Sequence, residues 1–566
     1  MRKRKGIRGL KKKVGKFSLK GGLSRISRRQ GVTYLIVALG VMMILGIAFR
    51  GYLKNDDVED VIGQYKITKN PQNKAALGIS PVKTFNPLVS KDEDTYYLSK
   101  IIYSSLFTFD ENMTPKEDLV ESYRFSGRTV KITVKNTQWE DGRSVSADDV
   151  AFTLKAIKSI GDNGPYGSVA KKIKRISYGS GGDRTFTVHF NSGYDMSLAY
   201  LHFPILPKHK YSGVDALKRD TENFVPWSSG LYHCSTYDEL KGMKLTVNDK
   251  YYGVKAKSNI DVKIVKNGGS KDNLVASGNI SALVDKSPER AGNIHKRGIK
   301  IHNFRSNNVE FIGFNTKDAA VKSVEMRKAI AYCTDIESII EENYYNSAKG
   351  SRSIYPHDYM NSPNQLEYSF SKDRANDVLK KAGYSDKNSS GSIEDKDGNK
   401  VTLKILVEKD KERRVKTAER ISKALKEIGI NSEIVSVKRD VFLSKLRARD
   451  YSIYIGGLSL DGAMDMSSIL KSDGENNFTG YSNRKVDGLL DELMSGKTVD
   501  ESRKVLDELK KNIHEDLPYY CICYPTYGIV KAPVFNGELK SNFMNPYNGA
   551  ETWYSNYEKR VETPKE

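Results

Sequence analysis

The chain has 566 residues, which is too long for a single hydrophobic core and predicts roughly three or four domain-sized units, or two lobes with insertions. Apolar residues make up 38% and aromatic residues 10% of the chain, with only 16 Pro, and this composition excludes wholesale disorder. The net charge of +22 would ordinarily suggest a nucleic-acid partner, but 13 Lys and Arg lie before residue 30 without any Asp or Glu, which leaves +9 for the rest.

The first predicted element is a transmembrane helix over residues 32–49. These eighteen residues carry no charge and would form about 27 Å of helix, just enough to cross a bilayer. The basic segment 1–31 precedes them, whereas residues 51–60 hold four acids against one Lys. This asymmetry predicts a cytoplasmic N-terminus and places everything after Arg50 outside the cell membrane.

A cleaved signal peptide is the alternative for this apolar segment, although its basic region is unusually long and no A-x-A site follows it. A lipoprotein anchor is not expected, because no Cys follows the apolar run. The basic segment lacks interleaved aromatic residues, so we interpret it as a topology signal that can also lie on anionic lipid, and not as a nucleic-acid site. Residues 50–75 are polar and predict a stalk, and the globular part should begin near Ala76.

Residues 129–135 alternate apolar and polar side chains and precede the turn pair Asp141-Gly142, which predicts a β-hairpin. Ser146 and Asp149 have the spacing of a capping box, so a helix should begin there. The polar, low-complexity stretch 385–400 predicts a surface loop.

Residues 401–456 alternate strand and helix patterns at lengths typical of a parallel sheet with right-handed crossovers. The predicted elements are, in order, strand 403–407, a helix ending at Gly429, strand 432–437, helix 441–449 and strand 451–456.

Ligands of such sheets bind beyond the carboxyl ends of the strands, so residues 456–465 become a candidate site. Its charged groups are Asp461 and Asp465. Asp465 has a structural explanation as the N-cap of a short helix over 466–471, whereas the sequence gives no such role for Asp461.

Two further helices are predicted around residues 486–493 and 505–513, followed by a Pro-bounded strand over 518–525. Cys521 and Cys523 should point to the same face of that strand, a poor geometry for a disulfide, and are interpreted as buried thiols. The chain has four Cys, without the second CxxC or His pair of a structural zinc site, so no metal cluster is expected.

The chain contains no complete copy of three common catalytic motifs. His514-Glu515 lacks the second His of a zincin, Gly496-Lys497-Thr498 lacks the Gly that a phosphate-binding loop needs at position 491, and no G-x-S-x-G elbow occurs. We therefore expect a binding protein without catalytic residues, cofactor or metal, while carboxylates distant in sequence keep an enzyme open as an alternative.

Six segments resemble, in chain order, the peptide/nickel-binding family of ABC-transporter extracytoplasmic solute-binding proteins, which includes the dipeptide- and oligopeptide-binding proteins. The strongest motifs are the D-G-x-x-x-[ST]-A-D-D-V run from Asp141 and the R-x-A-I-x-Y-x-x-D run from Arg327. The six segments are residues 85–126, 139–157, 229–253, 311–335, 369–384 and 477–492.

The resemblance implies an α/β fold of two periplasmic-binding-protein-like lobes, with an inserted extra domain and crossing strands near residues 303–315 and 517–525. On this chain the implied limits are a discontinuous lobe I of 76–96, 205–305 and 526–566, an inserted domain of 97–204, and a lobe II of 306–525.

The resemblance also implies a site between the lobes. Asp461 would pair with the N-terminal ammonium of a peptide, because an ammonium taken out of water needs a carboxylate. Backbone groups of Gly456, Gly457 and Leu458 on one side, and of Ser90, Lys91 and Asp92 on the other, would pair with the peptide as an added strand. Arg352 is a weaker candidate, as the residue that would bind a carboxylate of the ligand. Leu458 and Gly462 stand where peptide-binding relatives often have aromatic residues, which widens the expected pocket and leaves the ligand class open.

The predicted function is that of a monomeric, membrane-anchored peptide receptor that delivers peptides to ABC permease subunits and has no nucleic-acid partner. Three alternatives remain: a binder of a metal chelate, haem or glycan, a peptide sensor without a transporter, and an enzyme.

Overall fold

The computed structural model describes residues 65–67, 74–193, 196–222, 224–238, 241–266, 268–286, 298–363 and 368–559. The predicted basic segment, the transmembrane helix 32–49 and most of the stalk lie outside these residues. Within the described ranges, no helix combines the length and the apolar character needed to cross a membrane.

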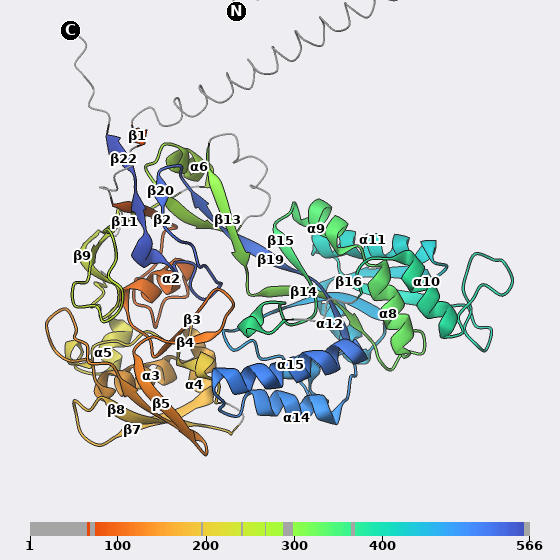
Figure 1. The fold of residues 1–566 in the computed structure, drawn as a ribbon, viewed down its shortest axis with the longest axis horizontal. Coiled ribbons are helices and arrows are strands. Elements are labelled where there is room, and N and C mark those ends of the chain that lie inside the picture. The colour runs from red at the N-terminus through yellow and green to blue at the C-terminus, as the bar shows by residue number, and fades with distance from the viewer. Residues whose placement is uncertain are drawn as a thin grey trace, which may run out of the picture. The chain divides into compact units, whose positions relative to one another are not determined.

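A mixed sheet of twelve strands runs through the protein (Figure 1). Its order is β17-β16-β18-β14-β19-β12-β2-β11-β10-β9, and β13 and β15 also pair with β19. The strands of what we call lobe I are β2 (Ala75–Ile79), β9 (Tyr232–Asp238), β10 (Gly242–Val247), β11 (Ile260–Ile264), β12 (Ala282–Asp285) and β13 (Lys300–Arg305). Those of lobe II are β14 (Asn308–Phe314), β15 (Ala348–Arg352), β16 (Thr402–Glu408), β17 (Asn431–Val437) and β18 (Ile453–Ser459).

Strand β19 (Tyr519–Lys531) joins the two lobes. Its first part pairs with β14, up to Glu310 opposite Cys523, and its second part pairs with β13, from Arg305 opposite Thr526. The prediction that the strand ends at Pro525 is therefore wrong. Proline lacks an N–H, but Pro525 lies between these two ladders, and its carbonyl accepts a hydrogen bond from the Ser306 N–H at 2.9 Å.

A β-bulge in β19 corrects the prediction for its two cysteines. Phe311 lies opposite Cys521 and Glu310 opposite Cys523, so Ile522 is an extra residue in the ladder. Cys521 consequently packs in the same apolar cluster as Phe311, whereas Cys523 packs in a different cluster with Ile522. The expectation of a common face is wrong, but both thiols are buried and free, as predicted.

The predicted parallel unit of lobe II is confirmed. Helix α11 (Glu412–Glu427) connects β16 to β17, and α12 (Arg439–Ala448) connects β17 to β18. Strand β16 pairs in parallel with both β17 and β18. The carboxyl ends of these strands therefore meet at one edge of the sheet.

Helices cover both faces of this part of the sheet (Figure 1). One face packs against α8 (Val324–Cys333), α9 (Ile336–Tyr344), α10 (Lys372–Lys381) and α11. The other packs against α12, α13 (Ser467–Leu470), α14 (Arg484–Leu493) and α15 (Val499–Asp516). Helices α14 and α15 confirm the two helices predicted there. Residues 385–400 form no helix or strand and are mostly exposed, as predicted for a loop.

A separate antiparallel sheet has the order β5-β6-β8-β7. Its strands are β5 (Val120–Ser126), β6 (Thr129–Val134), β7 (Ile173–Tyr178) and β8 (Thr185–Phe190), and the shorter pair β3 (Phe107–Phe109) and β4 (Pro115–Glu117) lies nearby in the chain. The predicted turn at Gly142 forms, but among the described residues it is flanked only by an isolated bridge between Gln138 and Ser144. The hairpin prediction is wrong because β6 pairs instead with β5 and β8.

The capping box predicted at Ser146 and Asp149 is confirmed, and α3 (Ala147–Ile160) begins there. The Asp149 carboxylate also accepts a hydrogen bond from the indole N–H of the fully buried Trp139 at 3.3 Å. The remaining helices of this half are α2 (Glu93–Ile102), α4 (Gly167–Lys172), α5 (Val214–Arg219) and α6 (Gly268–Ala276).

Candidate functional site

A cavity of ≈ 750 Å³ lies at the carboxyl edge of β16, β17 and β18, where the sequence predicts a site. Lobe II supplies Asn308 and Glu310 of β14, Gly457 to Ser459 of β18, and the N-terminal turns of α11 and α12. The other wall comes from Lys286 and from residues 525–527 of β19. The cavity, which we call the cleft, is therefore bordered by residues from both lobes.

The floor of the cleft holds a bidentate ion pair. Arg414 donates to Glu310 from Nε at 2.6 Å and from Nη2 at 2.9 Å, and the two side chains are only 17% and 14% exposed. Burial opposes the charge of Arg414, but the hydrogen bonds and charge of Glu310 outweigh it and raise the pKa of the guanidinium. Two parallel, charge-assisted bonds fix the orientation of this side chain.

Gly457 allows Arg414 to occupy that position. A Cβ at residue 457 would overlap the Arg414 guanidinium and would lie 2.7 Å from the carbonyl oxygen of Val309. The sequence indicated Gly457 as a backbone contact, and the structure gives a steric reason for glycine there. Gly457 and Leu458 line the cleft, whereas Gly456 is not among its lining residues and faces the Tyr454 ring, 2.5 Å from where its Cβ would be.

Two helices begin at the cleft. The N-cap residues of α11 and α12 are Lys411 and Lys438, and neither end is capped by a side-chain hydrogen bond. The N-terminal N–H groups of a helix carry partial positive charge. The described lining adds six cations, Lys286, Lys411, Arg413, Arg414, Lys416 and Arg439, against three acids, Glu310, Asp410 and Glu412.

Thr526 contributes a buried hydroxyl to the wall of the cleft. The residue is 5% exposed, and its Oγ1 has no hydrogen-bond partner among the described residues. Its N–H donates to the carbonyl of Ser347 at 2.9 Å, so the backbone at this position is fixed while the side chain is unsatisfied. Buried hydroxyls usually have partners, which makes Thr526 a candidate to bind a ligand.

Asp461 is not among the residues that line the cleft. It follows the Gly457–Ser459 segment, and its Oδ1 accepts a hydrogen bond from the Ala463 N–H at 3.0 Å. Burial, and then the charge of Asp465, raise the pKa of the Asp461 carboxyl, whereas that N–H and the charge of Lys172 act in the opposite direction. Within the described part of the chain, no ion pair holds Asp461.

The turn that carries Asp461 packs against other parts of the protein. A Cβ at Gly462 would lie 3.0 Å from the Phe109 ring and 3.1 Å from Met544 Cε. The expectation that Gly462 widens the pocket is therefore wrong, because these two side chains fill the space. Asp465 accepts from the Ser467 N–H at 2.9 Å, and the helix that follows is shorter than predicted, since α13 begins at Ser467 and Met466 is its N-cap.

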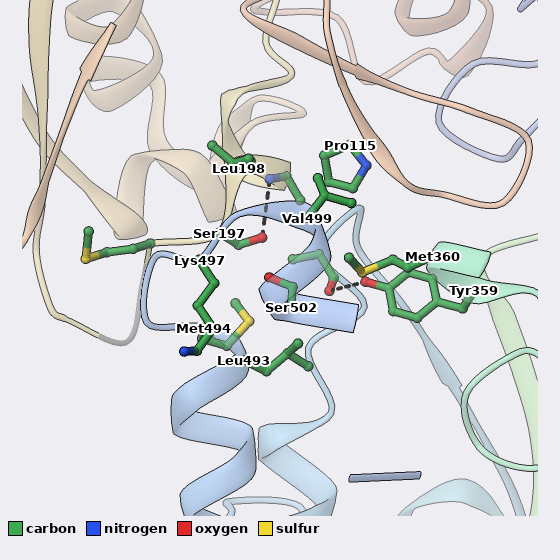
Figure 2. Close-up of a pocket in the computed structure, with 13 residues that line it drawn as sticks. Pro115, Ser197, Leu198, Tyr359, Met360, Leu493, Met494, Lys497, Val499 and Ser502 are labelled. Carbon is green, nitrogen blue, oxygen red and sulfur yellow. Dashed lines mark hydrogen bonds between the residues drawn. The ribbon is translucent and has the colours of Figure 1, made fainter. Parts of the chain in front are cut away.

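Figure 2 shows a smaller cavity of ≈ 30 Å³ beside this turn, large enough for about one water. Tyr359 borders it and donates from its hydroxyl to the carbonyl of Ala463 at 3.2 Å. The Met196 N–H donates to the Met494 carbonyl at 2.9 Å, which ties the segment after β8 to the end of α14. The hydrogen bond from Tyr359 therefore holds the Asp461 turn in place, while the bond from Met196 joins two other segments that border the same cavity.

The other predicted site residues are engaged locally. The Asp92 carboxylate accepts from the Lys83 N–H at 2.8 Å, and Ser90 Oγ accepts from the Asp92 N–H at 3.1 Å, at the start of α2. Lys91 between them is exposed. Arg352 lies at the end of β15 and donates to Glu337 at 2.7 Å. The structure does not place Ser90, Lys91, Asp92 or Arg352 in the lining of the cleft.

Sequence reasoning missed most of the charged groups of the cleft. Lys411 and Arg413 follow β16 and Arg439 follows β17, so the rule that indicated residues 456–465 would also have indicated them. Thr526 and Glu310 had no such signal, because their position depends on the pairing of distant strands. Among the described residues, no group of three or more His, Cys, Asp or Glu side chains is arranged to hold a metal ion.

Comparison with known proteins gives a consistent picture. Residues 114–480 match the family model described as bacterial extracellular solute-binding proteins, family 5 middle. The chain is 25% identical to the oligopeptide-binding protein AppA of Bacillus subtilis, over 92% of this chain and 98% of that protein. It is 21% identical to heme-binding protein A of Haemophilus influenzae, over 83% and 89% of the two chains.

Among solved structures, the ABC transporter substrate binding protein CtaP of Listeria monocytogenes has the same fold. The TM-score is 0.64 at 20% identity, over 86% of this chain and 100% of that one. This likeness supports the two-lobed architecture predicted from the sequence.

Proposed function

The chain belongs to family 5 of the bacterial extracellular solute-binding proteins, and from that membership we propose that it binds peptides between its two lobes and delivers them to an ABC permease. The description of the family as solute-binding proteins supports a binding role. The similarity to an oligopeptide-binding protein extends over almost the whole of both chains, which supports a peptide as the ligand.

The observation that carries the proposal is Asp461, a half-buried carboxylate that follows the cleft-lining residue Ser459 by two positions and that no ion pair holds in the described structure. A half-buried carboxylate without a cation is unfavourable, and the N-terminal ammonium of a peptide would supply the missing charge. Gly457 and Leu458 at the end of β18 would contribute backbone groups to the same ligand.

Binding would bring lobes I and II together. The strands that join them meet where β19 changes partner, between Cys523 and Thr526, and a limited change of backbone dihedrals there would move one lobe against the other. We propose the domain limits given above for these moving parts: 76–96, 205–305 and 526–566 for lobe I, 97–204 for the inserted domain and 306–525 for lobe II.

We further propose that the protein acts as a monomer held at the cell membrane by residues 32–49, with its binding domain outside. The asymmetry of charge around this apolar segment supports that orientation.

The second candidate is a non-peptide solute, and the similarity to a heme-binding protein favours it. Leu458, which lines the cleft and stands where peptide-binding relatives often have an aromatic residue, agrees with a different ligand. In that case Asp461 would be an ordinary turn residue, and its substitution by Asn would leave the affinity for the ligand unchanged.

Native mass spectrometry of the full chain, purified in detergent, tests the proposal, with release and identification of co-purifying molecules. A series of peptide masses would support peptide binding and give the preferred length. A single non-peptide mass would favour the second candidate. Loss of peptide uptake on deletion of the gene, restored by the wild-type chain, would distinguish a transport receptor from a sensor.

A further inference from the structure

We propose that the cleft selects peptides that present an acidic side chain to the N-terminal turns of α11 and α12, so that peptides with a Glu or Asp bind more tightly than the same peptides with Gln or Asn. This inference rests on the proposed peptide-binding function and adds the chemical class of the ligand. The groups that receive the carboxylate are Lys411, Arg439 and the hydroxyl of Thr526.

The charges of the cleft are the first argument. Its described lining has an excess of cations over acids, and not all of these cations are equally available. Arg414 is bound on two nitrogens by Glu310, and Lys416 lies 2.7 Å from Glu412, four residues earlier on α11. Lys411 lines the cavity, and its ammonium has no ion-pair partner among the described residues.

Arg439 is the second available cation. Its side chain is 68% exposed, and Nη1 lies 3.4 Å from the carboxylate of Glu408, which is itself only 4% exposed. Glu408 therefore anchors one side of the guanidinium, and the remaining N–H groups are left for a ligand. Arg413 lies over the Tyr344 ring at 5.7 Å, which orients its guanidinium at the same wall.

The N-termini of two helices also favour an anionic ligand in the cleft. Helices α11 and α12 have 16 and 10 residues, and both begin at this edge with a lysine at the N-cap and no side-chain cap. A carboxylate there is attracted by the partial positive charge of the free N–H groups. A lysine at an N-cap cannot accept these hydrogen bonds, so an acceptor from outside the helix would satisfy them.

Thr526 gives an argument for a bound ligand that is independent of the charges in the cleft. Its hydroxyl is buried without a partner on the opposite wall of the cleft, from the strand that joins the lobes. A hydroxyl donates to a carboxylate, and this contact would connect the ligand to both lobes at once.

The test uses the full chain and four pentapeptides. They are Ala-Ala-Glu-Ala-Ala and Ala-Ala-Gln-Ala-Ala, each with a free and an amidated C-terminus, and their dissociation constants are measured by isothermal titration calorimetry. Tighter binding of both Glu peptides than of the matching Gln peptides, by roughly tenfold, would support the inference, whereas a preference only for the free over the amidated C-terminus would overturn it. Equal binding of all four peptides would overturn the inference while leaving the peptide-binding function intact.

Binding of none of the four, together with a co-purifying non-peptide molecule, would overturn the proposed function and this inference with it.

The variant Lys411→Gln/Arg439→Gln tests which residues act. It should weaken binding of the preferred acidic peptide by roughly tenfold or more and should not weaken binding of the amidated Gln peptide, which has no carboxylate. Lys409→Gln is the matched control, because Lys409 is exposed on the same loop and does not line the cleft. Thr526→Val keeps the shape of the side chain and should weaken only the acidic peptide. Unchanged selectivity in the double variant would overturn the assignment.

Discussion

The guanidinium of Arg414 lies where a side chain at residue 457 would otherwise be, so Arg414 and Gly457 are matched across the floor of the cleft. The ion pair with Glu310 holds Arg414 in this place. Near the end of β18, the space that a side chain at residue 457 would take is thus occupied by the charged group of Arg414.

Gly457→Ala should therefore be destabilising. The added methyl group would overlap Arg414 and lie 2.7 Å from the Val309 carbonyl oxygen, and the backbone atom cannot move without disturbing the β14–β18 ladder. We expect a loss of about 1–3 kcal/mol in the free energy of unfolding, measured by urea denaturation. Gly488→Ala is the control, since nothing lies within 4 Å of its Cβ position, and this helical site should gain stability. Equal effects of both substitutions would contradict the steric argument.

The Glu310–Arg414 pair should show strong coupling. Glu310→Gln leaves a mostly buried guanidinium without its carboxylate and is expected to cost about 3 kcal/mol of unfolding free energy. Replacing both residues, as Glu310→Gln/Arg414→Met, should recover a large part of that loss. A double-mutant cycle by chemical denaturation measures the coupling, and additive effects would mean that the pair is only a surface contact.

Asp461→Asn should stabilise the ligand-free protein at neutral pH. Burial raises the pKa of this carboxyl above its unfolded value, so the folded state holds its proton more tightly. Its contribution is then most favourable below the unfolded pKa and is lost as pH rises through the folded pKa. The difference in unfolding free energy between the variant and the wild type should therefore grow from acidic to neutral pH.

The same variant should bind peptides less well, because the amide cannot compensate the charge of an ammonium. We expect a loss on the order of 2 kcal/mol for a peptide with a free N-terminus and almost none for its N-acetylated form. Calorimetry on the two peptides separates these cases. Equal losses for both would indicate that Asp461 acts through the structure of its turn and not through the ammonium.

Residues 32–49 are predicted to anchor the protein, a prediction that the described structure leaves untested. The full chain should sediment with membranes and resist extraction by high salt, whereas a chain that begins at Val61 and follows a cleavable export signal should be released. Release of the full chain by high salt would contradict a transmembrane anchor, and a shortened N-terminus in the mature protein would indicate a cleaved signal peptide.

The sequence predicted those parts of the fold that depend on local patterns. The capping box at Ser146 identified the start of α3, and the alternation of apolar residues over 403–456 identified a parallel β-α-β-α-β unit. Both predictions rest on apolar periodicity and on capping residues within a short segment. These patterns do not depend on which distant segment the element packs against. The same unit predicted the edge of the sheet at which the cleft lies.

Other features followed only from distant pairing. In the sequence alone, Pro525 predicts the end of a strand. Strand β19 nevertheless continues, because it pairs with β14 before Pro525 and with β13 after it. Cys521 and Cys523 pack in different apolar clusters because β19 has a bulge opposite Glu310. The spacing of the two cysteines in the sequence does not predict this bulge. Arg352 pairs with Glu337, and Ser90 and Asp92 bond with each other at the start of α2, contacts that a family resemblance alone does not reveal.

What the sequence by itself determined is therefore the kind of protein, an α/β solute-binding protein, and the edge of the sheet at which a ligand would lie, because both rest on local periodicity and on ordered motifs. What only the tertiary structure decided is the chemistry of that edge. Lys286, Glu310, Arg414 and Thr526 become neighbours of one cavity although they are far apart in the chain. Their proximity depends on the order in which strands pair across both lobes, and strand order is a property of the assembled sheet and not of any segment within it.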